Sequence, residues 1–260
     1  MVNDSKMIVA EIYIYPIKSC RGIQLQEAEV TPKGFLWDRE FMLVDSRGKF
    51  LTQRQHANLA RIQVQLAGDL MALSVEDCNL NPFLFKPTLT GREIEVEIWR
   101  DRTPAIDQGD EVAEWFHSAL ELDSDRKYRL VRQSPSYIRS IDKNYAVREG
   151  EPVSFADGYP FLMTATASLA ELNRRIKKSY KNESQEVPMN RFRPNIVVNT
   201  SEPFIEGNWK YIQIGSVQFA VVKPCSRCII TTTDQLTGKR NELQEPLKTL
   251  STFRQLGNQD

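Results

Sequence analysis

Short segments in which apolar and polar residues alternate constrain this chain most strongly, because alternation with a period of two places every second side chain on one face of a β-strand. Segment 8–17, IVAEIYIYPI, has this pattern and predicts a strand that ends at Pro16. In segment 40–53, two apolar runs flank Asp45–Gly48, DSRG, a sequence typical of a hairpin turn. Further strands are expected at 61–68, 70–76 and 93–100. We therefore expect the first 105 residues to be mostly β.

Two segments have the apolar spacing of helices. Val112, Phe116 and Leu120 recur every four positions, which predicts a helix from Asp110, a plausible N-cap, to about residue 122. A second helix is expected to open near Ser168, where Ser168 and Glu171 have the spacing of a capping box. Its apolar stripe consists of Leu169, Leu172, Ile176 and Tyr180, and its other face is rich in lysine and arginine, as a solvated helix face is.

The order of elements predicts the fold class. The polar, irregular segment 133–157 is interpreted as a long surface loop that can shape an active site. Strands are expected at 126–133, 195–200, 211–223 and 228–234. The pattern predicts an α+β fold that is mostly β, with a barrel-like or strongly curved sheet. We divide it into an N-terminal β-barrel-like domain, residues 1–105, and a second β-rich domain with a few helices, residues 106–260.

The charge balance argues against large charged or apolar partners. The 260 residues include 34 Lys plus Arg and 34 Asp plus Glu, so no net field favours nucleic acid or a membrane surface. No apolar run approaches the ~20 residues of a membrane span, and the first residues do not resemble a secretory signal. Four cysteines in a chain of this length do not form a secreted disulfide framework. We expect a cytoplasmic protein with no nucleic-acid or membrane partner.

Cys225 and Cys228 form a C-x-x-C pair, for which three interpretations stay open. Both thiols can be small buried hydrophobic groups. They can also contribute to a metal site, although a zinc site needs about four ligands, and the other cysteines, Cys20 and Cys78, lie far away in the sequence. A redox pair is the third interpretation, but such a pair precedes a helix, whereas the β-branched residues that follow Cys228 favour a strand.

Cationic and hydroxyl residues at the ends of expected strands suggest an anion site, because guanidinium groups bind phosphate through two parallel hydrogen bonds. Each arginine taken alone is more typical of a solvated surface. The segment MTATASL also places hydroxyl groups at a helix start, where free N–H groups favour phosphate. The candidates are Lys18, Ser19, Arg39, Gln53, Arg54, Arg191, Arg193, Arg227, Thr164, Thr166 and Ser168.

Several common chemistries lack their sequence motifs. The chain has no G-x-G-x-x-G sequence, no P-loop and no G-x-S-x-G elbow. It contains only two histidines, and neither lies near an evident nucleophile, so a Ser-His-Asp hydrolase is not expected.

Six segments, read in order, resemble one family. They are IYPIKSCRG, GFLWDREFMLVD, LTQRQ followed by LARI, DGYPFLMTATASLAELN, NRFRPNIVV and KPCSRCIITTTDQLTG, spread over residues 7–256. The chain resembles the MOSC-domain proteins, in the branch with an N-terminal MOSC β-barrel subdomain. That branch includes the mitochondrial amidoxime-reducing components and the bacterial hydroxylaminopurine-resistance reductase. RFRPN followed by CSRCIITT is far more specific than the C-x-x-C pair alone.

The resemblance implies a molybdenum cofactor, Mo-molybdopterin, with the Cys228 thiolate as metal ligand and catalytic residue. Soft thiolates suit such transition metals. It also implies cofactor contacts from residues at matching positions of the family segments. These residues are Lys18, Ser19, Arg39, Thr164, Thr166, Arg193 and Ser226. Several cationic side chains would then face the anionic tail of the pterin, although the chain as a whole is neutral.

By the same resemblance, the expected reaction is the two-electron reduction of N-hydroxylated small molecules, such as amidoximes, hydroxylamines and N-hydroxy bases. The four scattered cysteines offer no iron–sulfur motif, so a separate reductase is expected to donate electrons. Family members continue beyond the position of Asp260, so the closing strands of the MOSC barrel are expected to be missing. A sulfur- or cofactor-carrier protein without turnover and a structural zinc protein are the alternatives.

Overall fold

The computed structural model describes residues 7–76, 78–123, 125–180 and 185–255. As predicted, these residues form an α+β fold that is mostly β. The chain divides into two compact units, which we describe separately. Unit 1 comprises Met1–Tyr13, Phe161–Asp234 and Arg240–Asp260, and unit 2 comprises Ile14–Pro160 and Gln235–Lys239. The domain boundary expected near residue 105 stays a prediction.

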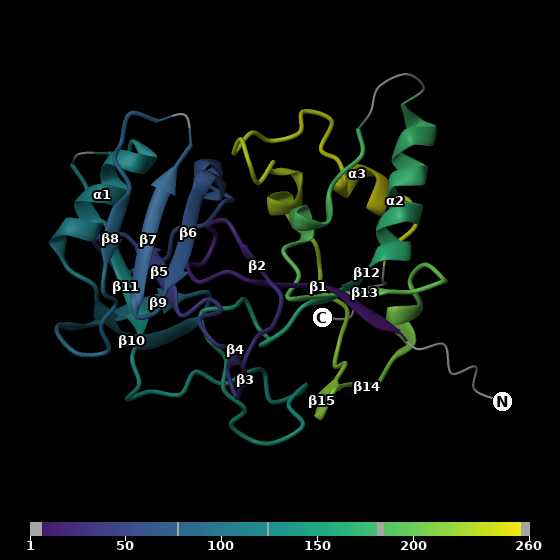
Figure 1. The fold of residues 1–260 in the computed structure, drawn as a ribbon, viewed down its shortest axis with the longest axis horizontal. Helices are drawn as coiled ribbons and strands as arrows, with labels where there is room; N and C mark the ends of the chain where they lie inside the picture. Colours follow the sequence, from purple (N-terminus) through teal and green to yellow (C-terminus); the bar gives the residue numbers. More distant parts are fainter. Residues whose placement is uncertain (1–6, 77, 124, 181–184, 256–260) are drawn as a thin grey trace. The chain divides into compact units, whose positions relative to one another are not determined.

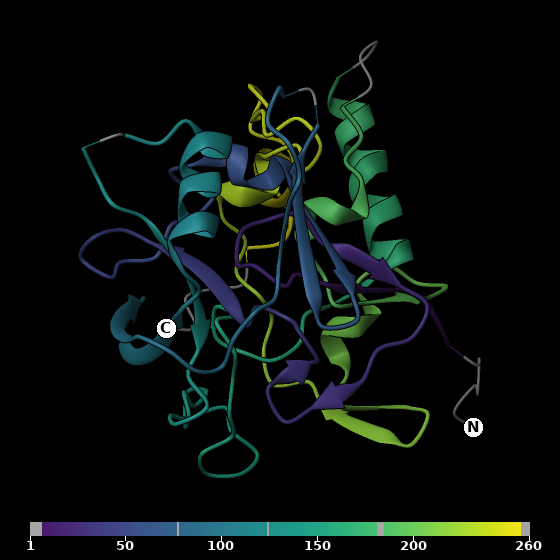
Figure 2. The ribbon, with the colours of Figure 1, turned by 60° about the vertical axis from the view of Figure 1, so that its left-hand side comes forward.

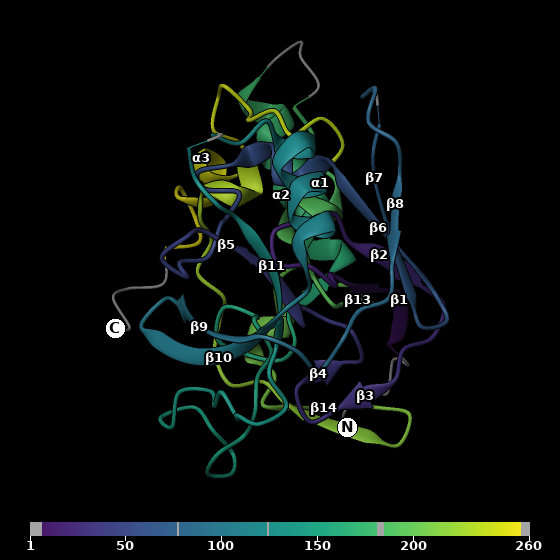
Figure 3. The same ribbon diagram turned by 90° about the vertical axis from the view of Figure 1, so that its left-hand side faces the viewer.

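Unit 2 contains two larger antiparallel sheets, a short two-stranded sheet formed by β3 and β4, and one α-helix among its described residues. The larger sheet has the order β5–β11–β10–β9, and the smaller has the order β6–β7–β8. Helix α1, Asp110–Leu120, packs against β11 and β8 (Figures 1 and 3). The strands are β2 Ile23–Leu25, β3 Val30–Thr31, β4 Gly34–Phe35, β5 Phe41–Val44, β6 Ile62–Ala67, β7 Leu70–Val75, β8 Phe83–Phe85, β9 Glu93–Ile98, β10 Asp101–Asp107 and β11 Arg129–Gln133.

The larger sheet separates two apolar clusters, which explains why β5 is apolar at all four positions. Phe41 and Leu43 point into a cluster with β6, β7 and α1, whereas Met42 and Val44 point into a second cluster that includes Phe155. A strand covered on both faces needs no polar alternation. By contrast, β7 buries alternate residues only, although four of its residues in a row are apolar.

The predicted turn at Asp45–Gly48 is present and needs its glycine. Gly48 has a φ of +77°, and a Cβ atom there would lie 2.6 Å from the Glu95 carbonyl oxygen. The backbone N–H of Leu51 donates to the Leu43 carbonyl over 2.8 Å, so the chain folds back along β5 as a hairpin does.

The segment from residue 134 to residue 157 contains no regular element apart from an isolated bridge between Ser140 and Pro152, and Figure 3 shows it as the long teal loop below β10. The expectation of a surface loop is wrong for its last part, because Val153 and Phe155 are fully buried. The buried Arg139 side chain donates to the carbonyl oxygens of Ser154 and Ala156 over 2.8 and 2.7 Å. This guanidinium satisfies backbone groups that burial would otherwise leave unpaired.

Unit 1 combines a small sheet with helix α2, Thr166–Ser179. Strand β13, Ile196–Asn199, pairs in parallel with β12, Met163–Ala165, and antiparallel with β1, Ile8–Ile14. A separate hairpin joins β14, Tyr211–Ile214, to β15, Val217–Ala220 (Figure 2). The stripe predicted on α2 is confirmed, because Leu172 and Ile176 are buried, and α3, Leu247–Leu250, packs on the same cluster.

Three local predictions are wrong. Residues 229–232 form a 3₁₀ turn rather than a strand, because the Thr231 and Thr232 hydroxyls bond to backbone carbonyls three residues earlier. Helix α2 begins two residues before Ser168, whose hydroxyl instead donates to Glu206 over 2.6 Å. The N-cap of α1 is Gly109 and not Asp110, which is the first helical residue.

No helix in the described ranges combines the length and the apolarity needed to cross a membrane.

Candidate functional site

The C-x-x-C pair of unit 1 lies on an irregular segment that enters a tight turn. Cys228 is the residue before the 3₁₀ turn Ile229–Thr232, and its carbonyl accepts from the backbone N–H of Thr231 over 3.1 Å and from the Thr231 hydroxyl over 3.0 Å. Cys225 is exposed, Cys228 is half-buried, and neither forms a disulfide. The structure therefore fixes the backbone of Cys228 and leaves its thiol partly accessible.

A buried arginine holds the turn that follows Cys228. Arg191 donates to the Thr232 carbonyl over 2.7 Å and forms a 3.0 Å ion pair with Asp234. Burial lowers the pKa of the Arg191 guanidinium, and the Asp234 carboxylate opposes this shift. The sequence suggested Arg191 only as an anion ligand, whereas these contacts make it a support of the cysteine segment.

The neighbouring Arg227 ties the same segment to the 3₁₀ turn Met189–Phe192. Its guanidinium lies 5.1 Å from the centre of the Phe192 ring and donates to the Phe192 carbonyl over 3.4 Å. It also lies 3.7 Å from the Cys225 sulfur. Two residues of one turn, Arg191 and Phe192, thus contact the segment on both sides of Cys228.

The other candidates of unit 1 are near chain reversals. Arg193 ends the turn Met189–Phe192 in the left-handed conformation, with a φ of 54°, and is partly buried. Thr164 lies in β12, where its hydroxyl contacts the Met189 sulfur at 3.2 Å, and Thr166 is the first residue of α2. Ser226 is exposed beside Cys225. The sequence placed both threonines at a helix start, and the structure places Thr166 there but Thr164 in the short strand that precedes the helix.

Lys18 and Ser19 lie in unit 2, in a turn that begins two residues after Pro16. The Lys18 ammonium is buried, donates to the Phe155 carbonyl over 2.9 Å and forms a short ion pair with Asp157. Ser19 has a φ of 69°, and its carbonyl accepts from the Gln53 amide over 2.6 Å. Burial lowers the pKa of Lys18 below its ordinary value, although the nearby Asp157 carboxylate acts to raise it.

Asp157 is the partner that sequence reasoning missed, since it lies 139 positions from Lys18. Burial acts to raise its pKa, but the Lys18 charge and hydrogen bond outweigh this effect and lower the pKa to about 2. The carboxylate therefore stays ionised at neutral pH. The only sequence signal near Asp157 is the neighbouring Gly158, a residue type that is common in turns.

Arg39 lies close to Lys18 and is held from two sides. Its guanidinium donates to the buried Asp38 carboxylate over 2.6 Å and lies 4.3 Å from the centre of the Tyr15 ring. The Arg39 carbonyl accepts from the Phe155 N–H, whose own carbonyl accepts from Lys18. The structure thus brings Lys18, Ser19 and Arg39 together around one end of the 134–157 loop.

The predicted site residues belong to different units. Lys18, Ser19 and Arg39 are in unit 2, whereas Thr164, Thr166, Arg193, Ser226 and Cys228 are in unit 1. That the two groups form one site stays a prediction. Among the residues that the structure describes, no group of three or more His, Cys, Asp or Glu side chains is placed to hold a metal ion.

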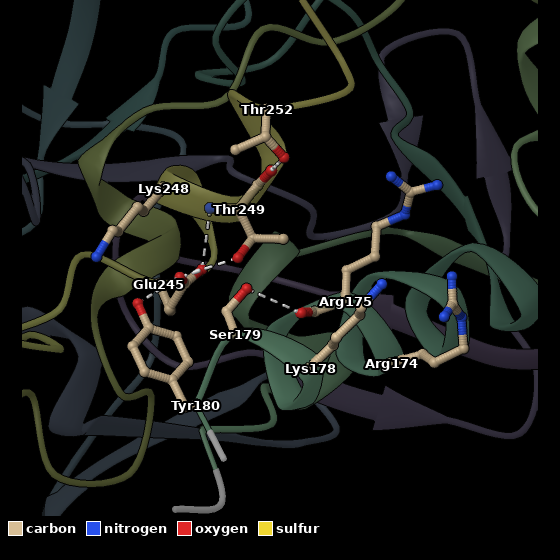
Figure 4. Close-up of a pocket in the computed structure, with 9 residues that line it drawn as sticks. All are labelled: Arg174, Arg175, Lys178, Ser179, Tyr180, Glu245, Lys248, Thr249 and Thr252. Carbon is tan, nitrogen blue, oxygen red and sulfur yellow. Dashed lines mark hydrogen bonds between the residues drawn. The ribbon is translucent and has the colours of Figure 1, made fainter.

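A pocket of about 500 Å³ in unit 1 contains none of the predicted site residues. It lies between α2 and α3, and its buried Glu245 accepts from Tyr180 and Thr249, both over 2.9 Å. Figure 4 shows Arg174 and Arg175 extending away from Glu245, and both pair with Glu171 at 2.7 Å. Because these cations diverge and already have a carboxylate partner, the pocket is not an evident anion site.

Comparisons with known proteins identify the family. Residues 6–123 match the MOSC N-terminal beta barrel domain, and residues 150–259 match the MOSC domain. The chain is 33% identical over 253 residues to mitochondrial amidoxime-reducing component 1 of Homo sapiens, covering 95% of this chain and 72% of that protein. It is 33% identical over 255 residues to mitochondrial amidoxime reducing component 2 of Bos taurus, with the same coverage.

A further relative is the molybdenum cofactor sulfurase of Danio rerio, which is 32% identical over 265 residues. The match covers 97% of this chain but spans only 31% of the sulfurase. The chain belongs to the MOSC-domain proteins that carry an N-terminal MOSC β-barrel domain.

Proposed function

We propose that this protein is a molybdenum-cofactor-dependent reductase of N-hydroxylated compounds, with Cys228 as the metal ligand. The observation that carries the proposal is the environment of Cys228. The residue is half-buried and forms no disulfide. Its carbonyl accepts from the Thr231 hydroxyl, and Arg191 holds the nearby Thr232 carbonyl. A thiolate is a suitable ligand for a soft or high-valent transition metal. The names of the amidoxime-reducing relatives support the reaction class.

The residues present fit an anionic pterin cofactor. The Lys18 ammonium has three N–H donors, and its hydrogen bonds to Phe155 and Asp157 engage two of them among the described residues. The third is available to a phosphate. Arg39, Arg193, Ser19, Thr164, Thr166 and Ser226 are the further contacts that we assign to the cofactor.

When bound, the cofactor supplies the two-electron chemistry that breaks an N–O bond. An amidoxime gains two electrons and two protons, and the products are an amidine and water. The chain holds the metal ligand rigidly, because the Arg191 contacts restrict the turn after Cys228. In unit 2, Asp157 and Arg139 fix the end of the 134–157 loop beside Lys18.

Metal analysis and a pair of cysteine variants test this proposal. Protein from a host that makes the cofactor should contain close to one molybdenum per chain together with a pterin, and it should reduce benzamidoxime when given a chemical electron donor. Cys228→Ala should abolish turnover, whereas the matched variant Cys225→Ala should retain it. Zinc without pterin, or normal turnover by the Cys228→Ala protein, would contradict the proposal.

A carrier of sulfur or cofactor is the second candidate, because the chain is also similar to a molybdenum cofactor sulfurase. A carrier would hold a persulfide on Cys228, or release its cofactor to an acceptor, without reducing any N-hydroxylated compound. Mass spectrometry of the purified protein distinguishes the two, since a persulfide adds one sulfur to the peptide that contains Cys228. A separate reductase as electron donor and a cytoplasmic location are part of the leading proposal.

A further inference from the structure

Trp99 occupies a turn position that does not favour a tryptophan. Ile98 and Asp101 pair across the β9–β10 hairpin, so Trp99 and Arg100 form its two-residue turn. Such turns prefer Asn, Asp or Gly because they require positive φ angles, and Trp99 has a φ of 56°. A bulky side chain in this conformation is a genuine outlier and often marks a functional residue.

The Trp99 indole is anchored and yet accessible. Its N–H donates to an Asp157 carboxylate oxygen over 3.2 Å, and the Phe50 ring packs edge-on at 5.0 Å between centroids. The Arg54 guanidinium lies 4.5 Å from the ring centre. Even so, 41% of the residue is exposed. A large aromatic surface that is fixed in orientation can bind a flat ligand without losing much side-chain freedom.

The adjoining Asp157 offers a hydrogen-bond acceptor beside this surface. Its side chain is 59% exposed. Within the described residues, its hydrogen bonds from Lys18 and Trp99 both end on Oδ1, which leaves Oδ2 as a free acceptor. An ionised carboxylate accepts strong hydrogen bonds from N–H and O–H groups. The indole and the carboxylate therefore combine a flat apolar surface with a negative acceptor.

We propose that Trp99 and Asp157 bind the planar, donor-bearing part of the substrate, so that Trp99 selects conjugated N-hydroxylated compounds over compounds without a plane. An aryl amidoxime has both features, because its flat conjugated group can stack on the indole while its amino group donates to the carboxylate, which leaves the N–O group free to react. This inference rests on the proposed reductase function, since that function defines the substrate class. Trp99 is then a specificity-determining residue.

Equilibrium dialysis with benzamidoxime tests the inference without turnover. The experiment uses the oxidised holoprotein with no electron donor. Trp99→Leu should raise the dissociation constant for benzamidoxime about fivefold or more, since loss of one stacked aromatic weakens binding to about this extent. Trp99→Phe keeps a plane but loses the N–H, so it should fall between Leu and the wild type. Trp209→Leu in unit 1 is the matched control and should bind benzamidoxime as the wild type does.

Steady-state kinetics supply the second measurement. Trp99→Leu should lower kcat/KM for benzamidoxime by a similar factor, chiefly through KM, and leave hydroxylamine, which has no plane to stack, within about twofold. Unchanged benzamidoxime binding would overturn the inference, as would equal losses for both substrates. Loss of molybdenum and pterin from the variant would also overturn it, because Trp99 would then support the cofactor. A wild type that binds benzamidoxime but never reduces it would instead refute the proposed function.

Discussion

At the scale of single residues, buried charges depend on partners that lie far away in the sequence. The segment around Lys18 indicated a cation at a strand end, and the structure places Lys18 in a turn four residues after the end of β1. It did not indicate that the ammonium is buried or that Asp157 compensates its charge. Local patterns report exposure and backbone preference, whereas ion pairs across 139 positions depend on the completed fold.

The Lys18–Asp157 pair makes stability depend on pH. The pKa of Asp157 is lowered from 3.8 to about 2, so its contribution is present above pH 4 and is lost as the pH falls toward 2. Because Asp157 is more than half exposed, we expect a contribution of only about 1 kcal/mol after solvent screening. Urea unfolding at a series of pH values should show that Asp157→Asn removes this part of the acid sensitivity.

The exposed Lys86–Asp69 pair is the matched control for that measurement. Both side chains are more than 60% exposed, so Asp69→Asn should leave the free energy of unfolding almost unchanged at neutral pH. By contrast, Asp157→Asn leaves the buried ammonium of Lys18 without its counter-ion. Equal effects of the two variants would show that the Lys18–Asp157 pair behaves as an ordinary surface pair.

At the scale of elements, the alternation of apolar and polar residues predicted strands well. The β-branched composition of a hydroxyl-rich segment predicted a strand that is not there. The strands at 62–67 and 93–98 follow their period-two patterns, and the strand expected at 70–76 is present at 70–75. Residues 228–234 were expected to be a strand because isoleucine and threonine are β-branched. Their threonine hydroxyls instead bond to the preceding carbonyls and stabilise a 3₁₀ turn. The start of α2 was misplaced for a related reason, since no side chain caps it.

Two hairpin glycines give an element-scale prediction. Gly48 and Gly68 both have positive φ angles, 77° and 64°, but a Cβ atom would clash with the Glu95 carbonyl only at Gly48. Gly68→Ala should cost about 1 kcal/mol through backbone strain alone, and Gly48→Ala should cost about 3 kcal/mol because the β9 backbone must also move. Thermal or urea unfolding measures both, and equal losses would mean that the turn at Gly48 relaxes freely.

At the scale of the whole molecule, composition and pattern defined the class of fold but not its compact units. Alternating strands with two helices predicted a mostly β, α+β protein, and the structure confirms it. Contacts group Gln235–Lys239 with Ile14–Pro160 in unit 2. One reason is that the side-chain amides of Gln235 and Gln53 donate to each other over 3.2 and 3.1 Å. Sequence periodicity carries no information on such long-range pairing. The neutral net charge likewise did not show that cations gather beside Lys18.

Unit 2 should fold without unit 1. Almost all of it is one continuous stretch, Ile14–Pro160, and this stretch contains both apolar clusters that cover the β5–β11–β10–β9 sheet. A domain of this length with its own core is large enough to be stable alone. Unit 1 draws on three separate stretches of chain, so no single fragment reproduces it. We expect the fragment 14–160 to show a cooperative thermal transition and near-ultraviolet circular dichroism. Phe116→Ala, which removes a fully buried ring, should destabilise the fragment by about 3–5 kcal/mol and lower its midpoint. A fragment that unfolds without cooperativity would show that its two clusters are insufficient and that the remaining segments, residues 235–239 among them, are needed to complete the fold.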